Sequence, residues 1–145
     1  MIKTVLVVCI GNICRSPMAE GLLGHVLPEM KIVSAGLGAL VGQPADPHAV
    51  AVMKNLGLDI SGHRAKQLSG GLAKQADLIL VMDNAQRQEI QHLHPATTGR
   101  VFRLGELDKF DVPDPYREAR PAFENALELI QRGVEVWVPR IRALS

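Results

Sequence analysis

The chain contains little cysteine, few aromatic residues and almost no net charge. Only Cys9 and Cys14 are present, so neither a disulfide framework nor a four-cysteine zinc site can form within it. A net charge of +1 gives no reason to expect a nucleic acid or a membrane surface held by bulk electrostatics. No apolar run approaches the length of a membrane span, so we expect no membrane insertion.

The remaining composition is that of an ordinary globular chain. Hydrophobic residues make up 47% and charged residues 21% of 145 residues, which predicts a single domain over residues 1–145. The start, Met1–Thr4, leads directly into an apolar run without the small-residue cleavage site of a signal peptide. Together with the scarcity of cysteine, this favours a cytoplasmic location. The five histidines are scattered, and none has a companion at ligand spacing, so no metal site is expected.

Short apolar runs alternate with helical patterns along the chain. This alternation predicts an α/β fold, a doubly wound four-stranded parallel sheet with helices on both faces. Pro139 is expected to kink or end the last helix, which would leave the final six residues as a separate turn. The predicted strands are Val5–Val8, Lys31–Ser34, Ala76–Met82 and Arg100–Leu104, and the predicted helices are Pro17–Leu27, Pro47–Leu56, a short one at most over Ser69–Lys74, one from Asp83 to about Leu93, and one from about Pro121 onward.

The stretch Val5–Pro17, VLVVCIGNICRSP, joins the first strand to the first helix. Ser16 is predicted to cap this helix and Pro17 to be its first residue. In such a step, successive backbone N–H groups can turn inward and form a nest for an anion. Cys9 would lie at the floor of the nest, where the helix dipole and Arg15 both favour the thiolate. We therefore expect Cys9 to be nucleophilic near neutral pH.

The other residue types in this loop suit a phosphate. The guanidinium of Arg15 can bind two phosphate oxygens at once, which an ammonium group cannot. Gly11 permits backbone torsions closed to other residues, and Asn12 tolerates left-handed torsions and can bond locally to hold the loop. The hydroxyl of Ser16 can donate to the Cys9 thiolate. These residues predict a site for phosphoryl chemistry.

The loop resembles the signature of the low-molecular-weight protein tyrosine phosphatases, a cysteine followed by five residues and then Arg-Ser. It looks closest to the bacterial branch that dephosphorylates tyrosine autokinases of capsule or exopolysaccharide export. The resemblance implies a phosphate-binding loop that runs from Cys9 to Arg15 and includes the residue after the arginine. Its other members are Ile10, Gly11, Asn12, Ile13, Cys14 and Ser16. It extends over most of the chain, through Ser34–Gly36, Gly62–Ala65, Ala76–Asp83 and Asp114–Tyr116.

A second loop, Gly105–Arg117, carries the Asp-Pro-Tyr sequence of the family's acid loop. The resemblance implies that Asp114 is the general acid and base, and that Tyr116 stacks on the substrate ring. Asp111 is a rival acid that lacks the following Pro-Tyr. Arg117 stands where many members have a second aromatic residue, which thins that wall of the pocket and favours anionic substrates.

Three further positions follow from the resemblance. Leu40, in the Gly36–Pro47 loop, is expected to form the wall opposite the tyrosine. Ser34 and His63 match positions that support the loop asparagine by hydrogen bonds. Cys14 has two interpretations: it could capture an oxidised Cys9 as a disulfide, or it could pack as a small apolar residue.

The resemblance implies a protein-tyrosine-phosphatase that works through a phosphocysteine on Cys9 and needs no metal or organic cofactor. Its substrate would be a phosphotyrosine protein, a bacterial tyrosine autokinase with a tyrosine-rich tail. An arsenate reductase on the same fold is the alternative, but that chemistry needs further cysteines after Cys14, which are absent. A module that only binds phosphotyrosine or another anion would not need Asp114. No oligomeric state is predicted.

Overall fold

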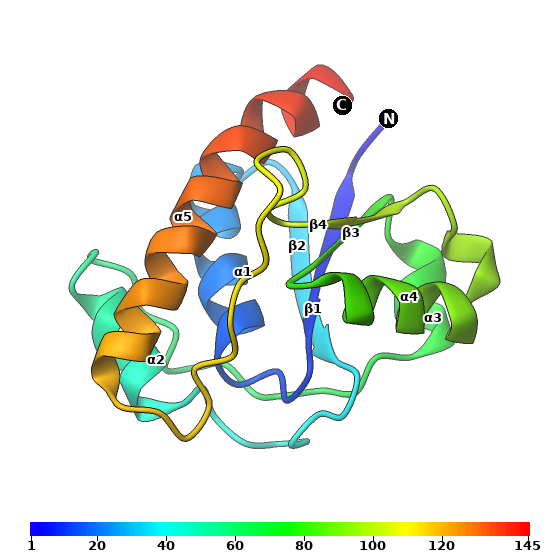
Figure 1. Ribbon diagram of the computed structural model, residues 1–145. Helices are drawn as coiled ribbons and strands as arrows, with labels where there is room; N and C mark the ends of the chain where they lie inside the picture. Colours follow the sequence, from blue (N-terminus) through cyan, green and yellow to red (C-terminus); the bar gives the residue numbers. More distant parts are fainter.

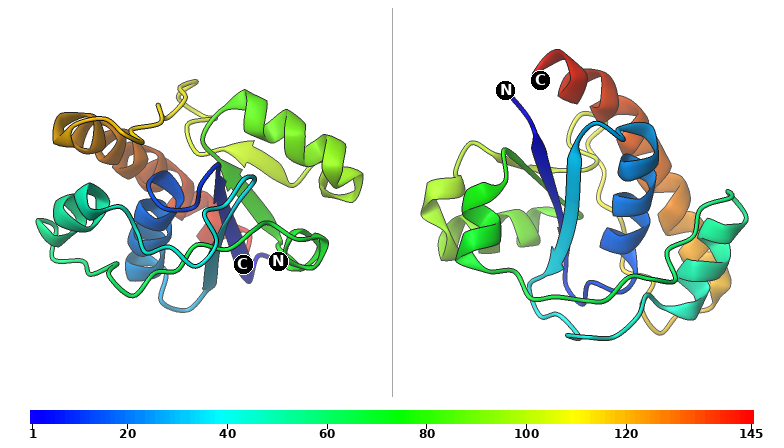
Figure 2. Two further views of the ribbon diagram at one scale, coloured as in Figure 1. Left: turned by 90° about the horizontal axis from the view of Figure 1, so that it is seen from below. Right: turned by 180° about the vertical axis from the view of Figure 1, so that it is seen from behind.

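The computed structural model describes residues 1–145 and consists of one four-stranded parallel sheet between two layers of helices. Helices α1, α2 and α5 cover one face, and α3 and α4 cover the other (Figures 1 and 2). This confirms the predicted doubly wound α/β fold. The elements are β1 (Thr4–Cys9), α1 (Arg15–Val26), β2 (Lys31–Gly36), α2 (Pro47–Lys54), α3 (Gly70–Gln75), β3 (Leu78–Val81), α4 (Asn84–Leu93), a 3₁₀ turn η1 (Pro95–Thr97), β4 (Val101–Arg103) and α5 (Arg120–Ala143).

Strand β1 lies in the interior of the sheet, whose order is β2-β1-β3-β4. Val7 is opposite Ser34 of β2 on one side and Leu80 of β3 on the other. The chain first winds from β1 to β2 and then crosses back to β3, so the direction of winding reverses beside β1. Ligands of open α/β sheets bind at the carboxyl ends of the strands at this reversal. Cys9, the last residue of β1, lies at this position.

The two faces of β1 pack into two apolar layers because successive side chains of a strand point to opposite faces. Val5, Val7 and Cys9 belong to the larger layer, beneath α1, α2 and α5. Leu6 and Val8 belong to the smaller layer, beneath α3 and α4. The thiol of Cys9 therefore lies on the side of the sheet from which α1 begins.

Helix α1 begins two residues earlier than predicted. Its N-cap is Cys14, which makes no side-chain capping bond, and Arg15 is its first residue. The prediction that Ser16 caps this helix is wrong, because the Ser16 hydroxyl contacts Cys9 and Asn12 instead of the helix backbone. The start of the helix thus supplies a side chain to the loop before it.

Helix α5 continues through Pro139 to Ala143. Of the kink or end predicted at this proline, the end is wrong, and so is the separate turn predicted for the final six residues. Proline removes one N–H donor, which leaves the carbonyl of Glu135 one turn earlier without its helical partner. Pro139 and Glu135 both lie on the exposed side, where water can reach that carbonyl. The buried side chains of Val138 and Ile141 hold the last turns against the core.

The two chain ends lie together, at the edge of the sheet away from Cys9 (Figure 1). The N–H of Ile2 donates to the carbonyl of Leu144 over 2.8 Å. None of the helices combines the length and the apolar character that crossing a membrane requires.

Candidate active site

The carbonyl groups of the loop after β1 are all bonded to neighbouring segments. The carbonyls of Cys9, Ile10 and Gly11 accept from Leu37, Gly38 and Leu40 over 2.9–3.0 Å. Further along, the carbonyl of Ile13 accepts from the N–H of Asp46 over 2.8 Å. The carbonyl of Asn12 lies 2.6 Å from Nε2 of His63. The chain after β2 and the His63 segment therefore hold the outside of this loop.

The N–H groups of the same loop consequently point the other way. In a planar trans peptide the N–H of a residue is opposed to the carbonyl of the residue before it, and the chain contains no cis peptide bond. The amides of residues 10–14 donate to no acceptor in the protein. Together with the N-terminus of α1 they form a nest of donors around the Cys9 sulfur, which is the arrangement that binds tetrahedral anions.

Asn12 is buried at the centre of the contacts that shape the loop. Its φ of 58° is left-handed, a conformation that asparagine adopts more readily than most residues. Its Nδ2 donates to Ser16 Oγ over 2.7 Å and to Ser34 Oγ over 3.0 Å. Its Oδ1 accepts from the N–H of Lys66 over 2.9 Å. Both the backbone and the side chain of this residue are thereby fixed.

The Cys9 sulfur is connected to this network through Ser16, whose Oγ lies 2.9 Å away. A second residue of α1, Glu20, was not found from the sequence. Its carboxylate accepts from Ser34 Oγ over 2.6 Å and lies 3.8 Å from Nδ1 of His63. A glutamate on a helix gives no sequence signal for such a role, because an exposed helical position would look the same.

Arg15 closes the loop and is almost fully buried, with 3% of its side chain exposed. Its Nη1 donates to the carbonyl of Val112 over 2.9 Å and lies 3.9 Å from Asp83. Its Nη2 lies 3.5 Å from the carboxylate of Asp114, whereas its buried Nε has no acceptor in the protein. A buried guanidinium with a free donor beside the nest is suited to an anion.

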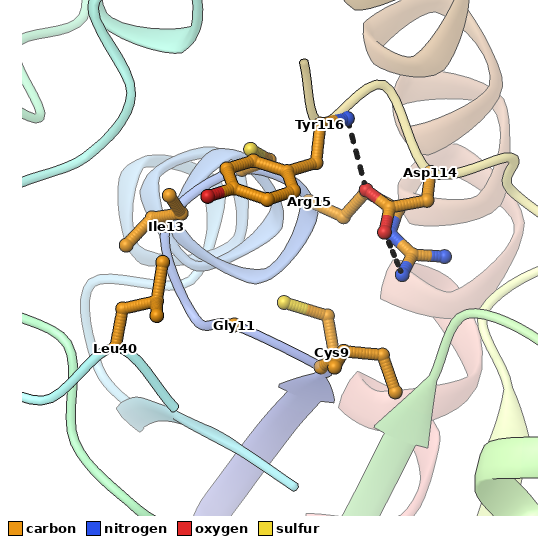
Figure 3. Close-up of a pocket in the computed structure, with 9 residues that line it drawn as sticks. Cys9, Gly11, Ile13, Arg15, Leu40, Asp114 and Tyr116 are labelled. Atoms are coloured by element: carbon orange, nitrogen blue, oxygen red, sulfur yellow. Dashed lines mark hydrogen bonds and ion pairs between the residues drawn. The ribbon is translucent and has the colours of Figure 1, made fainter. Parts of the chain in front are cut away.

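The Gly105–Arg117 loop brings Asp114 to the edge of the nest, where 47% of its side chain remains exposed. Its Oδ1 accepts from the N–H of Tyr116 over 3.1 Å, and the tyrosine ring borders the space above the Cys9 sulfur (Figure 3). The guanidinium of Arg117 lies 5.2 Å from the centre of that ring. Asp111, the rival acid, turns away and pairs with Arg103 over 3.0 Å.

The loops enclose a small cavity of about 50 Å³ above Cys9 (Figure 3). Of the residues predicted for the site, Asn12, Ser16, Ser34 and His63 are not on its wall but behind the loop, where they hold its shape. The cavity is lined by Cys9, Ile10, Gly11, Ile13, Cys14, Arg15, Leu40, Asp114 and Tyr116. Three segments far apart in sequence therefore meet at the carboxyl end of β1.

Asp83 and Val112 also contact Arg15 and were not found from the sequence. The sequence predicts Asp83 only as the start of a helix, and its carboxylate does accept from the N–H of Gln86 at the start of α4. Its position directly after a buried strand, at the same sheet edge as Cys9, is the signal that could have identified it. Nothing in the sequence marks the Val112 carbonyl, because every residue has a backbone carbonyl. No group of three or more histidine, cysteine or acidic side chains is placed to hold a metal ion.

Cys14 is buried in the larger apolar layer. Burial, followed by the nearby negative groups of Asp46, Cys9 and Asp114, raises the pKa of this thiol. Because the thiolate is the reactive form, Cys14 is a poor nucleophile in the folded chain. This supports the packing interpretation, and the redox role stays a prediction.

We expect iodoacetate, a small carboxylate that suits the anion nest, to alkylate Cys9 and to spare Cys14. Since the pKa of Cys14 is raised, its labelling should stay slow as the pH rises past the range where an ordinary cysteine ionises, about 8.5. Peptide mass mapping after timed labelling measures both sites. Inorganic phosphate should protect Cys9, and unfolding in urea should make the two cysteines react alike. Labelling of folded Cys14 as fast as in urea would contradict this assignment.

The fold and this site define a class: an α/β phosphohydrolase with a cysteine at the floor of an anion-binding loop. The family model for low molecular weight phosphotyrosine protein phosphatase matches residues 4–144, and the chain belongs to this family. It is 68% identical to a probable low molecular weight protein-tyrosine-phosphatase, EpsP, of Ralstonia nicotianae, with all of both chains covered.

Two more distant relatives agree. The chain is 42% identical to the low molecular weight protein-tyrosine-phosphatase Wzb of Escherichia coli K12, over 99% of this chain and 98% of the relative. The solved structure of Vibrio vulnificus Wzb in complex with benzylphosphonate superposes with a TM-score of 0.93 at 36% identity, covering 97% and 99% of the two chains. The predicted family is thereby confirmed, and the arsenate reductase alternative is not favoured.

Proposed function

We propose that this protein hydrolyses phosphotyrosine in proteins through a covalent phosphocysteine on Cys9. The observation that carries the proposal is the set of donors without protein acceptors around one sulfur: the amides of residues 10–14 and the buried Nε of Arg15. A buried donor without an acceptor, such as this Nε, is costly by about 1–3 kcal/mol, and a ligand can supply the missing acceptor. A phosphoryl group provides the oxygens that this set requires.

In the first step, the Cys9 thiolate attacks phosphorus. The S–P bond forms while the bond from phosphorus to the phenolic oxygen breaks, and Asp114 gives its proton to that oxygen. Arg15 and the loop amides hold the charge on the remaining phosphoryl oxygens. In the second step, a water attacks the phosphocysteine and gives a proton to Asp114. The S–P bond breaks, inorganic phosphate leaves, and the thiolate returns.

The walls of the cavity support an aromatic phosphate ester. Tyr116 and Leu40 stand on either side of the opening above the Cys9 sulfur, so a planar ring could lie between them (Figure 3). Benzylphosphonate, bound by the Vibrio vulnificus relative, joins an aromatic ring to a tetrahedral phosphorus group. The same ligand chemistry suits the nest and walls described here.

The physiological substrate that we propose is a phosphorylated bacterial tyrosine autokinase, met in the cytoplasm. This rests on the resemblance of the chain to the bacterial branch of the family. The guanidinium of Arg117, exposed beside Tyr116, is in keeping with an anionic partner.

We expect the phosphorylated tail of such a kinase to be dephosphorylated faster than an unrelated phosphotyrosine peptide, with no turnover of a phosphoserine peptide. The ring of phosphotyrosine can pack against Tyr116 and Leu40 while its phosphate lies over Cys9, whereas phosphoserine has no ring to pack there. Release of inorganic phosphate measures all three. Mass spectrometry of acid-quenched enzyme should show phosphate on the peptide that contains Cys9.

The outcomes separate the parts of the proposal. Equal rates on both tyrosine peptides would remove the autokinase and leave the phosphatase. Thiol consumption that depends on arsenate, without phosphate release, would instead identify a reductase. Binding of the peptides without turnover would identify a recognition module.

A further inference from the structure

The loop that carries Asp114 is attached at its base to an arginine at the end of β4. Nη1 of Arg103 lies 3.0 Å from Oδ1 of Asp111, and Nη2 lies 3.2 Å from Oε2 of Glu106. The glutamate is held in turn by Arg87 over 2.9 Å. Only 12% of the Arg103 side chain is exposed. The hydrogen bonds that it donates to Asp111 and then to Glu106 raise the pKa of its guanidinium. One inward-facing cation thus holds two points of the loop.

The residue after Asp111 is fixed on both sides. The N–H of Val112 donates to the carbonyl of Met82, just beyond β3, over 2.9 Å, and its carbonyl accepts from Arg15 over 2.9 Å. Its side chain is buried in the core. Asp114 follows two residues later, after a proline whose φ is restricted. The position of the acid over the cavity therefore depends on a short, rigid path from the sheet.

We propose that Arg103 and Asp111 are positioning residues for Asp114. Their ion pair holds the loop so that the carboxyl group of Asp114 can protonate the leaving phenol. This inference rests on the proposed function. Asp111, the rival acid in the sequence, then has a different role. It touches no reacting atom but holds the backbone that leads to Asp114. Small displacements of a catalytic group have large effects on rate.

A purely structural role would look different from a positioning role. Asp111 is half exposed, and Glu106 still pairs with Arg103 when Asp111 is replaced, so we expect the loss of Asp111 to cost little stability. A displaced acid, in contrast, matters only when the leaving group needs its proton. The discriminating quantity is therefore the dependence of kcat/KM, which reports formation of the phosphocysteine, on the acidity of the leaving phenol.

The experiment compares phenyl phosphate, whose phenol is weakly acidic like tyrosine, with para-nitrophenyl phosphate, whose phenol is far more acidic. We expect Asp111→Asn to lower kcat/KM for phenyl phosphate about tenfold, a part of the ~10²–10⁴ that a general acid contributes. For para-nitrophenyl phosphate the loss should stay below about twofold. The urea midpoint of unfolding should be close to that of the wild type.

Asp108→Asn is the matched control. Asp108 lies in the same loop, three residues earlier, and pairs with Arg132 over 3.3 Å at the surface. Its removal should change neither ester. Arg103→Gln should reproduce the pattern of Asp111→Asn, and the double variant should be no worse than Arg103→Gln alone, since both changes remove one interaction.

Equal losses on the two esters, or a control variant that behaves like Asp111→Asn, would overturn the inference. Asp114→Asn tests the proposed function separately. If its loss does not depend on the leaving phenol, the role of Asp114 fails. If its loss is steep while that of Asp111→Asn is flat, only the positioning role fails.

Discussion

Replacement of Cys9 by serine should abolish turnover, with a loss on the order of 10⁶-fold, the scale of removing a catalytic nucleophile. The serine hydroxyl fits the same space but ionises far less readily than a thiol. The nest around it should not change, because its carbonyls are bonded to the segment after β2 and its asparagine to Ser34 and Lys66. Attack on phosphorus is therefore lost while the anion site remains.

Two measurements on Cys9→Ser distinguish loss of chemistry from loss of the site. Initial rates of phosphate release give the turnover, and calorimetric titration with inorganic phosphate gives the affinity of the nest. We expect an affinity within a few-fold of that of the wild type. A variant that retains a tenth of the wild-type rate would show that Cys9 is not the nucleophile. A variant that no longer binds phosphate would show that the sulfur is part of the anion site itself.

Local patterns in the sequence were sufficient for the fold. Strands β1 and β3 are short, mostly aliphatic and buried runs. Asp46 and Asp83 cap the starts of α2 and α4, as polar residues before a helix commonly do. The one long helix was misjudged because the effect of Pro139 depends on which side of α5 faces water. The three-and-four spacing of Val134, Val138 and Ile141 does indicate that side, and it places this proline away from the buried face.

The site was predicted in part, and the division has a physical reason. Two short motifs contain four of the cavity residues, and the spacing within each motif is set by the loop that it forms. The structure brings these residues to one cavity: Cys9, Arg15, Asp114 and Tyr116. Glu20 acts through contacts across the fold, so no neighbour in the sequence marks it, whereas the buried strand just before Asp83 is a signal for its place at this sheet edge. The sequence allows the Ser16 hydroxyl to cap the helix or to contact Cys9, and its contacts in the fold are with Cys9 and Asn12.

The second large effect is expected for Arg15→Lys. The charge is kept, but the planar fork that can bind two phosphoryl oxygens is lost, together with the bond from Nη1 to the carbonyl of Val112. An arginine that stabilises the charge of a transferred phosphoryl group contributes about 10³–10⁵ in kcat, and we expect a loss in this range. Because Arg15 also contacts Asp114, the variant should affect the acid loop as well as the nest.

Steady-state kinetics of Arg15→Lys on a phosphotyrosine peptide measure this effect, and phosphate titration measures the ground-state affinity. Arg132→Lys, the same change at an exposed arginine of α5, is the matched control and should leave kcat unchanged. A larger loss in kcat than in phosphate affinity is expected, since the fork best fits the planar array of oxygens in the transition state. If lysine sustained turnover within about tenfold of the wild type, charge alone would suffice at this position. The buried geometry of Arg15, with its unpaired Nε, would then have no part in the chemistry.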